Sequence, residues 1–214
     1  VKTVRHIPNR GIDLVALEKA LQENCIKAVV VIPNFHNPVG TLMSDAAKEK
    51  LVGLCAATGT IIIEDDVYAE LAYQDVRPRP LLSFDKKGFV IHCSSVTKTL
   101  APGLRVGWSI SRAFKNVIEH TRLFSQVTAP TLTQEIVAEF LASENFNKHC
   151  RKLSAKLRLQ RDLYRTRISE HFPKGTKISN PEGGFLLWLE LPRKCNSTAL
   201  FESGNNSFAP GIVF

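Results

Sequence analysis

Short apolar runs that each lead directly into a polar cluster constrain the fold more than any other feature of this sequence. Residues 28–32 (AVVVI) and 60–63 (TIII) are rich in β-branched side chains and do not alternate with polar ones. Runs of this kind are typical of strands that are buried on both faces, as in a parallel sheet. Residues 88–95 (GFVIHCSS) and 106–111 (VGWSIS) predict two further buried strands.

A helix is expected between the first two runs. Ser44 can accept a hydrogen bond from a free backbone N–H at the start of that helix. Apolar residues then recur on one helical face, and charged residues fall outside it. The apolar set is Ala47, Leu51, Leu54 and Cys55, and the outer set is Lys48, Glu49 and Lys50. Strand, helix and strand together predict a βαβ unit.

The rest of the chain predicts a second, smaller unit after a long helix. Helices are expected over 112–125, 131–143 and 146–171, and strands over 176–179 and 185–191, around the turn NPEGG. We therefore expect an α/β fold with a mostly parallel sheet in a large domain, 1–145, followed by a connecting helix and a small α+β domain, 146–214.

The net charge of +8 among 214 residues raises the possibility of nucleic-acid binding, but its distribution favours another interpretation. Much of the excess lies in residues 148–167, within the long predicted helix. Apolar residues recur there at helical spacing, namely Phe146, Cys150, Leu153, Leu157, Tyr164 and Ile168. A solvated basic face opposite an apolar stripe explains the charge, and stacking aromatics are not interleaved with it.

Membrane insertion and export are not indicated. No apolar run approaches the roughly 18 to 20 residues of a membrane helix, and the start VKTVRHIPNR lacks a signal-peptide core. Five widely spaced cysteines without a CxxC pair favour buried, reduced thiols in a cytoplasmic protein. The first residue is Val1 and the chain stops at Phe214 after an apolar Pro-Gly segment, so we expect a piece of a longer protein.

The polar clusters follow three predicted strands, and ligands of open α/β sheets bind beyond the carboxyl ends of strands. Lys98 follows the third run; in a partly desolvated cleft its amine would lose a proton more easily and could attack a carbonyl. Ser95, Thr97 and Arg105 offer hydroxyl and guanidinium donors suited to a phosphate. An aldehyde site beside a phosphate site describes pyridoxal 5'-phosphate.

The remaining polar atoms of that cofactor also find partners in the sequence. An aspartate keeps the ring nitrogen protonated, and either Asp65 or Asp66 is available. Asn37 and Tyr68 can donate to the phenolic oxygen. None of these residues indicates a pyridoxal-phosphate site by itself, but their order and spacing together do.

The motifs N-P-x-G at residues 37–40, D-x-x-Y at 65–68 and S-x-x-K at 95–98, with Arg105, resemble the fold-type I, class I/II pyridoxal-phosphate-dependent aminotransferases. The resemblance covers essentially the whole chain. The segments PNFHNPVGTLM, IIEDDVYAEL, SSVTKTLAPGLRVGW and EGGFLLWLELP are most similar to the subgroup that includes the MocR-type regulators, where this domain follows a GntR-type winged helix.

The resemblance implies an aspartate-aminotransferase-like fold and assigns roles. Lys98 would form the Schiff base and later move the substrate's α-proton. Asp65, three residues before Tyr68, would pair with the ring nitrogen. Asn37 and Tyr68 would hold the phenolic oxygen, and Ser95 and Arg105 the phosphate. It also implies a cis Asn37-Pro38 bond, a homodimer, and an amino acid and a 2-oxo acid as substrates.

The resemblance also implies that family features lie outside the chain at both ends: the phosphate-binding glycine loop and ring-stacking aromatic before it, and the carboxylate-binding arginine after it. The linker over 192–208 is shorter than in the family, and GNN at 204–206 interrupts it where a helix is expected. The chain alone is therefore expected to be a doubtful catalyst.

Several alternatives stay open or are disfavoured. The parent protein could be a transcription regulator that uses the same site as an effector sensor, with DNA contacts elsewhere and none in this segment. A serine acyl-transfer enzyme fits S-x-x-K, but the companion K-T-G and S-D-N motifs are missing. A metal site at residues 64–66 is disfavoured because no histidine is evident to complete it.

Other conspicuous residues have simpler expected roles. We expect His36 and His92 to be hydrogen-bonded at strand ends, and Trp108 and Trp188 to lie in the core. The pair at 183–184 (GG) predicts a tight turn, which the resemblance brings near the substrate.

Overall fold

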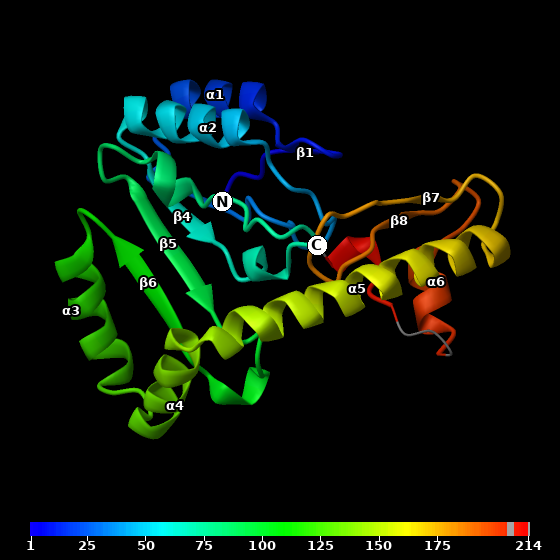
Figure 1. The fold of residues 1–214 in the computed structure, drawn as a ribbon. Coiled ribbons are helices and arrows are strands. Elements are labelled where there is room, and N and C mark those ends of the chain that lie inside the picture. The colour runs from blue at the N-terminus through cyan, green and yellow to red at the C-terminus, as the bar shows by residue number, and fades with distance from the viewer. Residues whose placement is uncertain (205–207, 214) are drawn as a thin grey trace.

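A four-stranded mixed sheet forms the centre of the protein in the computed structural model, which describes residues 1–204 and 208–213 (Figure 1). The strands are β3 (Ala28–Val31), β4 (Ile61–Asp65), β5 (Val90–Ser95) and β6 (Gly107–Ser111), in the order β3-β4-β5-β6. The first two pairs are parallel and β5 pairs with β6 antiparallel. The mostly parallel sheet and the βαβ unit agree with the sequence-based expectation.

Two helices, α1 (Leu14–Glu23) and α2 (Asp45–Thr58), pack together over one face of this sheet (Figure 1). The residues of β3 alternate in burial, and Val30, between two buried valines, is 70% exposed. The prediction that this run is buried on both faces is therefore wrong. Its β-branched composition reflects a preference for strand backbone, and helices cover only one face in the described part of the chain.

Helix α2 begins as its sequence predicts, but its charged residues do not all lie outside. Ser44 accepts the backbone N–H of Ala47 at 3.3 Å, and Gly59 ends the helix in the left-handed conformation, with φ of 67°. Lys48, expected outside, is 1% exposed. Its ammonium is hydrogen-bonded to the loops that follow β3 and β4, and this satisfies the buried charge.

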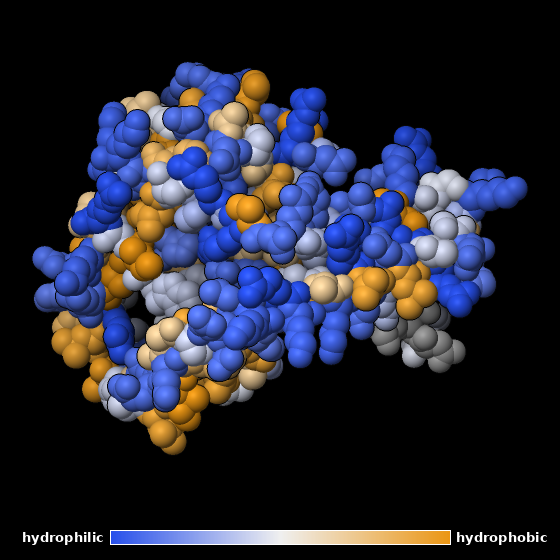
Figure 2. All heavy atoms as spheres, in the orientation of Figure 1, coloured by the Kyte–Doolittle hydropathy of each residue, from blue (hydrophilic) through white to orange (hydrophobic). Residues whose placement is uncertain are grey.

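The far edge of the sheet is more open than expected. Strand β6 lies at the edge of the sheet and is largely exposed, and Trp108, expected in the core, is 38% exposed, because the described part of the chain packs little over the faces of this strand. Helices α3 (Lys115–Gln126) and α4 (Thr131–Ala142) follow, close to the boundaries predicted for them. Apolar side chains gather on the surface over these two helices, at the lower left of Figure 2.

The long helix α5 (Glu144–His171) joins the two parts of the chain (Figure 1). Cys150 and Ile168 are buried, so the apolar stripe is real, but Tyr164 is 61% exposed and does not belong to it. The small part contains the antiparallel pair β7 (Lys177–Ile178) and β8 (Leu189–Glu190), shorter than predicted because only two residues of each strand pair.

Short elements complete the fold. They are the hairpin β1 (His6–Ile7) and β2 (Gly11–Ile12), helix α6 (Ser197–Glu202), and the 3-10 turns η1 (Ala69–Leu71), η2 (Leu81–Phe84), η3 (Pro102–Leu104) and η4 (Gly211–Val213). Helix α6 occupies part of the shortened linker. Asn205 and Asn206 of the GNN interruption lie outside the described residues. The domain boundary between residues 145 and 146 stays a prediction.

The five cysteines are unpaired, as expected, but Cys25 is exposed and does not fit the expectation of buried thiols. Trp188 is only partly buried and is not part of the core. Within the described ranges, none of the helices combines the length and the apolar character needed to cross a bilayer.

Candidate active site

The predicted site residues lie where the parallel strands end. Asp65 is the last residue of β4 and is opposite Cys93 of β5, and Ser95 is the last residue of β5. Lys98 follows in the loop between β5 and β6. Since parallel strands end at the same edge of the sheet, the polar residues that follow them meet there.

Lys98 is exposed and lies beside two aromatic rings that contact each other. Its Nζ is 6.0 Å from the ring centre of Tyr68 and 5.9 Å from that of Phe185. Among the described residues it has no hydrogen-bond or ion-pair partner. Rings at this distance attract an ammonium weakly and leave its nitrogen accessible. The amine is thus accessible, and no carboxylate among the described residues pairs with it.

Asp65 has an oxygen that no group among residues 1–204 and 208–213 satisfies. This oxygen, Oδ1, is buried and has no hydrogen-bond partner there. Burial raises the pKa of Asp65, while a hydrogen bond from the backbone of Val67 and the charge of Lys98 oppose that rise. A buried acceptor without a donor is costly, so this oxygen fits a ligand that brings an N–H group.

Tyr68 supplies a phenol beside these two residues. It is 5% exposed, and its ring meets that of Phe185 edge-on at 5.6 Å between centres. Burial, together with the negative charge of Asp65, raises the pKa of Tyr68. The phenol therefore stays protonated at neutral pH and can donate a hydrogen bond.

Asn37 lies half-buried in the loop after β3, and its bond to Pro38 is cis, as expected. The neighbouring His36 differs from expectation: its Nδ1 is buried and has no partner in the described part of the chain, so the ring is not simply hydrogen-bonded. Its ring centre is 4.7 Å from that of His6. Burial and then the charge of His6 lower the pKa of His36 to about 4.

Ser95 and Arg105 lie at the two ends of the loop that carries Lys98. The backbone N–H of Val96 donates to the carbonyl of Val106 at 3.2 Å and closes this loop. Arg105 adopts the left-handed conformation, with φ of 53°, and is exposed. Its guanidinium donates to the carbonyl of Pro102 at 3.3 Å, a weak bond that leaves its other donors for a ligand.

Asp66, the alternative to Asp65 in the sequence, is fully engaged inside the protein. It is 1% exposed, and its two oxygens accept from Asn34 and from Arg77, each at 2.7 Å. Asn34 in turn accepts from Lys48 at 2.7 Å. Asp66 thus belongs to a buried network beneath the site, and Asp65 is the carboxylate with a free acceptor.

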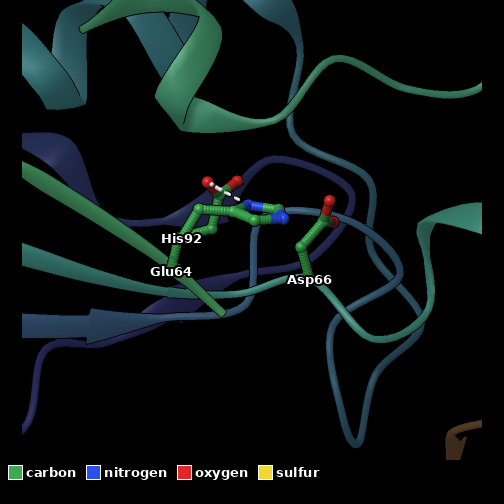
Figure 3. A group of neighbouring side chains, drawn as sticks. All are labelled: Glu64, Asp66 and His92. Carbon is green, nitrogen blue, oxygen red and sulfur yellow. Dashed lines mark hydrogen bonds and ion pairs between the residues drawn. The ribbon is translucent and has the colours of Figure 1, made fainter. Parts of the chain in front are cut away.

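A histidine lies beside the acidic residues 64–66, where the sequence analysis disfavoured a metal site. Figure 3 shows His92 beside Glu64 and Asp66, all three buried and with one potential ligand atom each within 4.8 Å of the others. Glu64, however, accepts from His92 at 2.9 Å and from the backbone of Leu81 and Leu82. Both carboxylates are already satisfied by protein donors, Glu64 by His92 and the backbone and Asp66 by Asn34 and Arg77, so the cluster is explained by buried hydrogen bonds. His92 is hydrogen-bonded, as predicted.

Comparison with known proteins places this geometry in a family. The sequence profile described as aminotransferase class I and II matches residues 1–206. The chain belongs to the aminotransferase class I and II family. Its fold is that of the fold-type I enzymes. It is similar to the alpha-aminoadipate aminotransferase LysN of Thermus thermophilus, with a TM-score of 0.86 and 28% identity, over 94% of this chain and 52% of that one.

Relatives of two kinds occur among its similar proteins. One is the "Uncharacterized HTH-type transcriptional regulator YjiR" of Escherichia coli, 39% identical over 87% of this chain and 40% of the relative. Another is "Aromatic-amino-acid aminotransferase 1" of Thermococcus litoralis, 29% identical over 97% of this chain and 52% of the relative. The chain thus spans about half the length of these relatives.

Sequence reasoning missed the residues that surround the predicted ones. The buried network of Asn34, Lys48 and Arg77 gave no signal, because each residue type is ordinarily exposed. Phe185 was assigned only to a strand. A glycine pair directly before an aromatic residue was the available indication, since tight turns bring the following side chain close to a neighbouring segment.

Proposed function

We propose that the protein to which these residues belong is a pyridoxal-phosphate-dependent aminotransferase, which exchanges the amino and keto groups of an amino acid and a 2-oxo acid. The observation that carries the proposal is the unpartnered, buried Oδ1 of Asp65 beside the unpaired amine of Lys98. When bound, the cofactor supplies an aldehyde that takes up amines and a ring that accepts electrons.

The side chains of this protein would then act as follows. Lys98 Nζ holds the cofactor covalently and, when released, moves the proton of the substrate's α-carbon. Asp65 Oδ1 accepts the N–H of the ring nitrogen and keeps it protonated. Tyr68, whose pKa is raised, donates its phenolic proton, and Asn37 donates from its amide.

Ser95 and Arg105 would bind the phosphate at the two ends of the closed loop. A hydroxyl and a guanidinium are both donors, and charge-assisted bonds of this type are the strong ones in phosphate sites.

We also propose the division into a large part, 1–145, and a small part, 146–214, together with a homodimeric assembly and a cytoplasmic location, all implied by the family resemblance.

Titration of the protein with pyridoxal phosphate tests the proposal, with the visible absorbance of the lysine-bound cofactor as the readout. We expect a new band in the wild type and in Lys86→Ala, an exposed lysine outside the site, and no band in Lys98→Ala. A band of equal strength in Lys98→Ala would show that another lysine binds the aldehyde.

A second function is supported by the similarity to a protein named as an HTH-type regulator. In that case the same residues bind the cofactor and sense an amino acid, and the DNA contacts lie outside this segment. Turnover separates the two functions. An aminotransferase converts many equivalents of amino acid when a 2-oxo acid is present, whereas a sensor binds the amino acid without sustained conversion.

A further inference from the structure

The turn at residues 181–185 is fixed tightly against the segment that follows Tyr68. The backbone N–H of Gly184 donates to the carbonyl of Leu71 at 3.0 Å, and the Tyr73 hydroxyl donates to the carbonyl of Gly184 at 2.8 Å. The Tyr73 N–H donates to the carbonyl of Glu182 at 2.9 Å. These three bonds from one short segment set the position of the next residue, Phe185.

Phe185 extends from this turn over the candidate site. Its ring centre is 5.9 Å from Nζ of Lys98 and 5.6 Å from the ring centre of Tyr68. The Phe185 side chain is nevertheless 45% exposed. A large apolar ring that is held in place and yet half open to solvent has a free face with which to contact a ligand.

We propose that Phe185 is a specificity-determining residue that selects amino acids with apolar side chains. The inference rests on the proposed function. With the cofactor bound, the substrate's amine would displace the Lys98 amine from the same carbon atom: a C=N bond to the substrate nitrogen would replace the C=N bond to Nζ, and the two protons that the substrate's ammonium loses would pass to Nζ, which leaves as an ammonium. The substrate's α-carbon is then one bond from the position that Nζ leaves.

A side chain that branches from this carbon lies within reach of the Phe185 ring. Residues 183–189 (GGFLLWL) contain no charged residue. Arg161 lines a pocket with Phe185, but its guanidinium already donates to the carbonyl of Pro181 at 2.7 Å and pairs with Asp162 at 2.7 Å. The nearest acid along the chain, Glu182, accepts from Gln74 at 3.4 Å. Burial of apolar surface against the ring therefore favours aliphatic and aromatic side chains over acidic ones.

The test measures binding without turnover. Two probes are titrated calorimetrically into the cofactor-free protein: N-(5'-phosphopyridoxyl)-L-leucine and the matching L-aspartate conjugate, with pyridoxal phosphate alone as a third ligand. The variants are Phe185→Ala and Phe185→Leu. The control is Phe172→Ala, which removes a ring of similar exposure, 42%, outside the site.

We expect Phe185→Ala to weaken binding of the leucine conjugate about tenfold, and to leave the aspartate conjugate and pyridoxal phosphate within about twofold. Phe185→Leu and Phe172→Ala should retain the preference for leucine. An equal loss for both conjugates, or an unchanged preference in Phe185→Ala, would overturn the inference alone. A wild type that binds none of the three ligands would overturn the proposed function and, with it, this inference.

Discussion

Replacement of Gly183 by alanine tests how closely the turn packs against the loop that follows β3. A methyl group built on Gly183 would lie 2.3 Å from Cζ of Phe35, and 2.5 and 2.6 Å from its two Cε atoms. Real Cβ atoms do not approach other atoms so closely, so the ring or the turn has to move. Phe35 is 1% exposed and packs with Tyr68 and Leu71, which leaves the ring little room.

The expected cost follows from this geometry. Overpacking of a close-packed region costs about 1 to 3 kcal/mol, and the enclosed ring puts Gly183→Ala in the upper half of that range. Urea unfolding followed by circular dichroism should show a lower midpoint with an unchanged slope, because the surface exposed on unfolding stays the same.

A matched control lies in α2. Gly53 is exposed in the interior of that helix, and a methyl group there meets no atom within 4 Å. Gly53→Ala should therefore stabilise the protein by about 0.5 to 1 kcal/mol, because alanine loses less backbone entropy in a helix. The double variant Gly183→Ala/Phe35→Leu has a smaller side chain opposite the new methyl group, so it should lose less stability through overpacking. Equal stability of Gly183→Ala and the wild type would refute the argument.

Two further predictions concern buried ionisable groups. Lys48→Met removes the donor to Asn34 and should lower the free energy of unfolding by about 2 to 4 kcal/mol, whereas Lys50→Met on the exposed face should change it by less than about 0.5 kcal/mol, both measured by urea unfolding. The pKa of His36 is lowered to about 4, so the folded protein binds fewer protons than the unfolded chain below about pH 6.5; its stability contribution is complete above that pH and is lost as the pH falls toward 4. We expect His36→Gln to reduce this loss of stability by about 1 to 2 kcal/mol, after allowance for partial exposure of the ring. The measurement is urea unfolding at several pH values. If the free energy of unfolding falls with pH as steeply in the variant as in the wild type, His36 is not the group responsible.

The order of elements in the large part could be predicted from the sequence because it depends on local patterns. The apolar runs predicted β3, β4 and β5, and the capping residue Ser44 predicted the start of α2. The polar residues at the strand ends gave the location of the site. Each of these signals is contained within a few consecutive residues, so no knowledge of distant contacts was needed.

Coverage of the sheet could not be predicted in the same way. The exposure of Val30 and Trp108 depends on which segments pack over each face, and a run of apolar residues carries no information about its covering layer. The prediction that Lys48 lies on the outer face failed for a related reason. Its partners Asn34 and the carbonyl of Arg79 are 14 and 31 residues away, so only the assembled fold brings them together.

The choice between Asp65 and Asp66 shows what the structure adds to the site. The spacing to Tyr68 favoured Asp65 by resemblance to a motif. The hydrogen bonds now give a physical reason, because Asp66 is saturated by Asn34 and Arg77 while Asp65 keeps a free oxygen. The glycine pair indicated a turn near the site, but the contact of the Phe185 ring with Tyr68 and Lys98 could not be inferred, since it depends on bonds between residues more than 100 positions apart.

Borohydride reduction of the protein with bound pyridoxal phosphate, followed by peptide mapping, tests the central proposal most directly. Reduction fixes the cofactor to the lysine that holds it. We expect one modified peptide that contains Lys98, and no such peptide from the Lys98→Ala variant. Modification spread over the exposed lysines, with Lys98 unmodified, would contradict the proposal that Lys98 holds the cofactor.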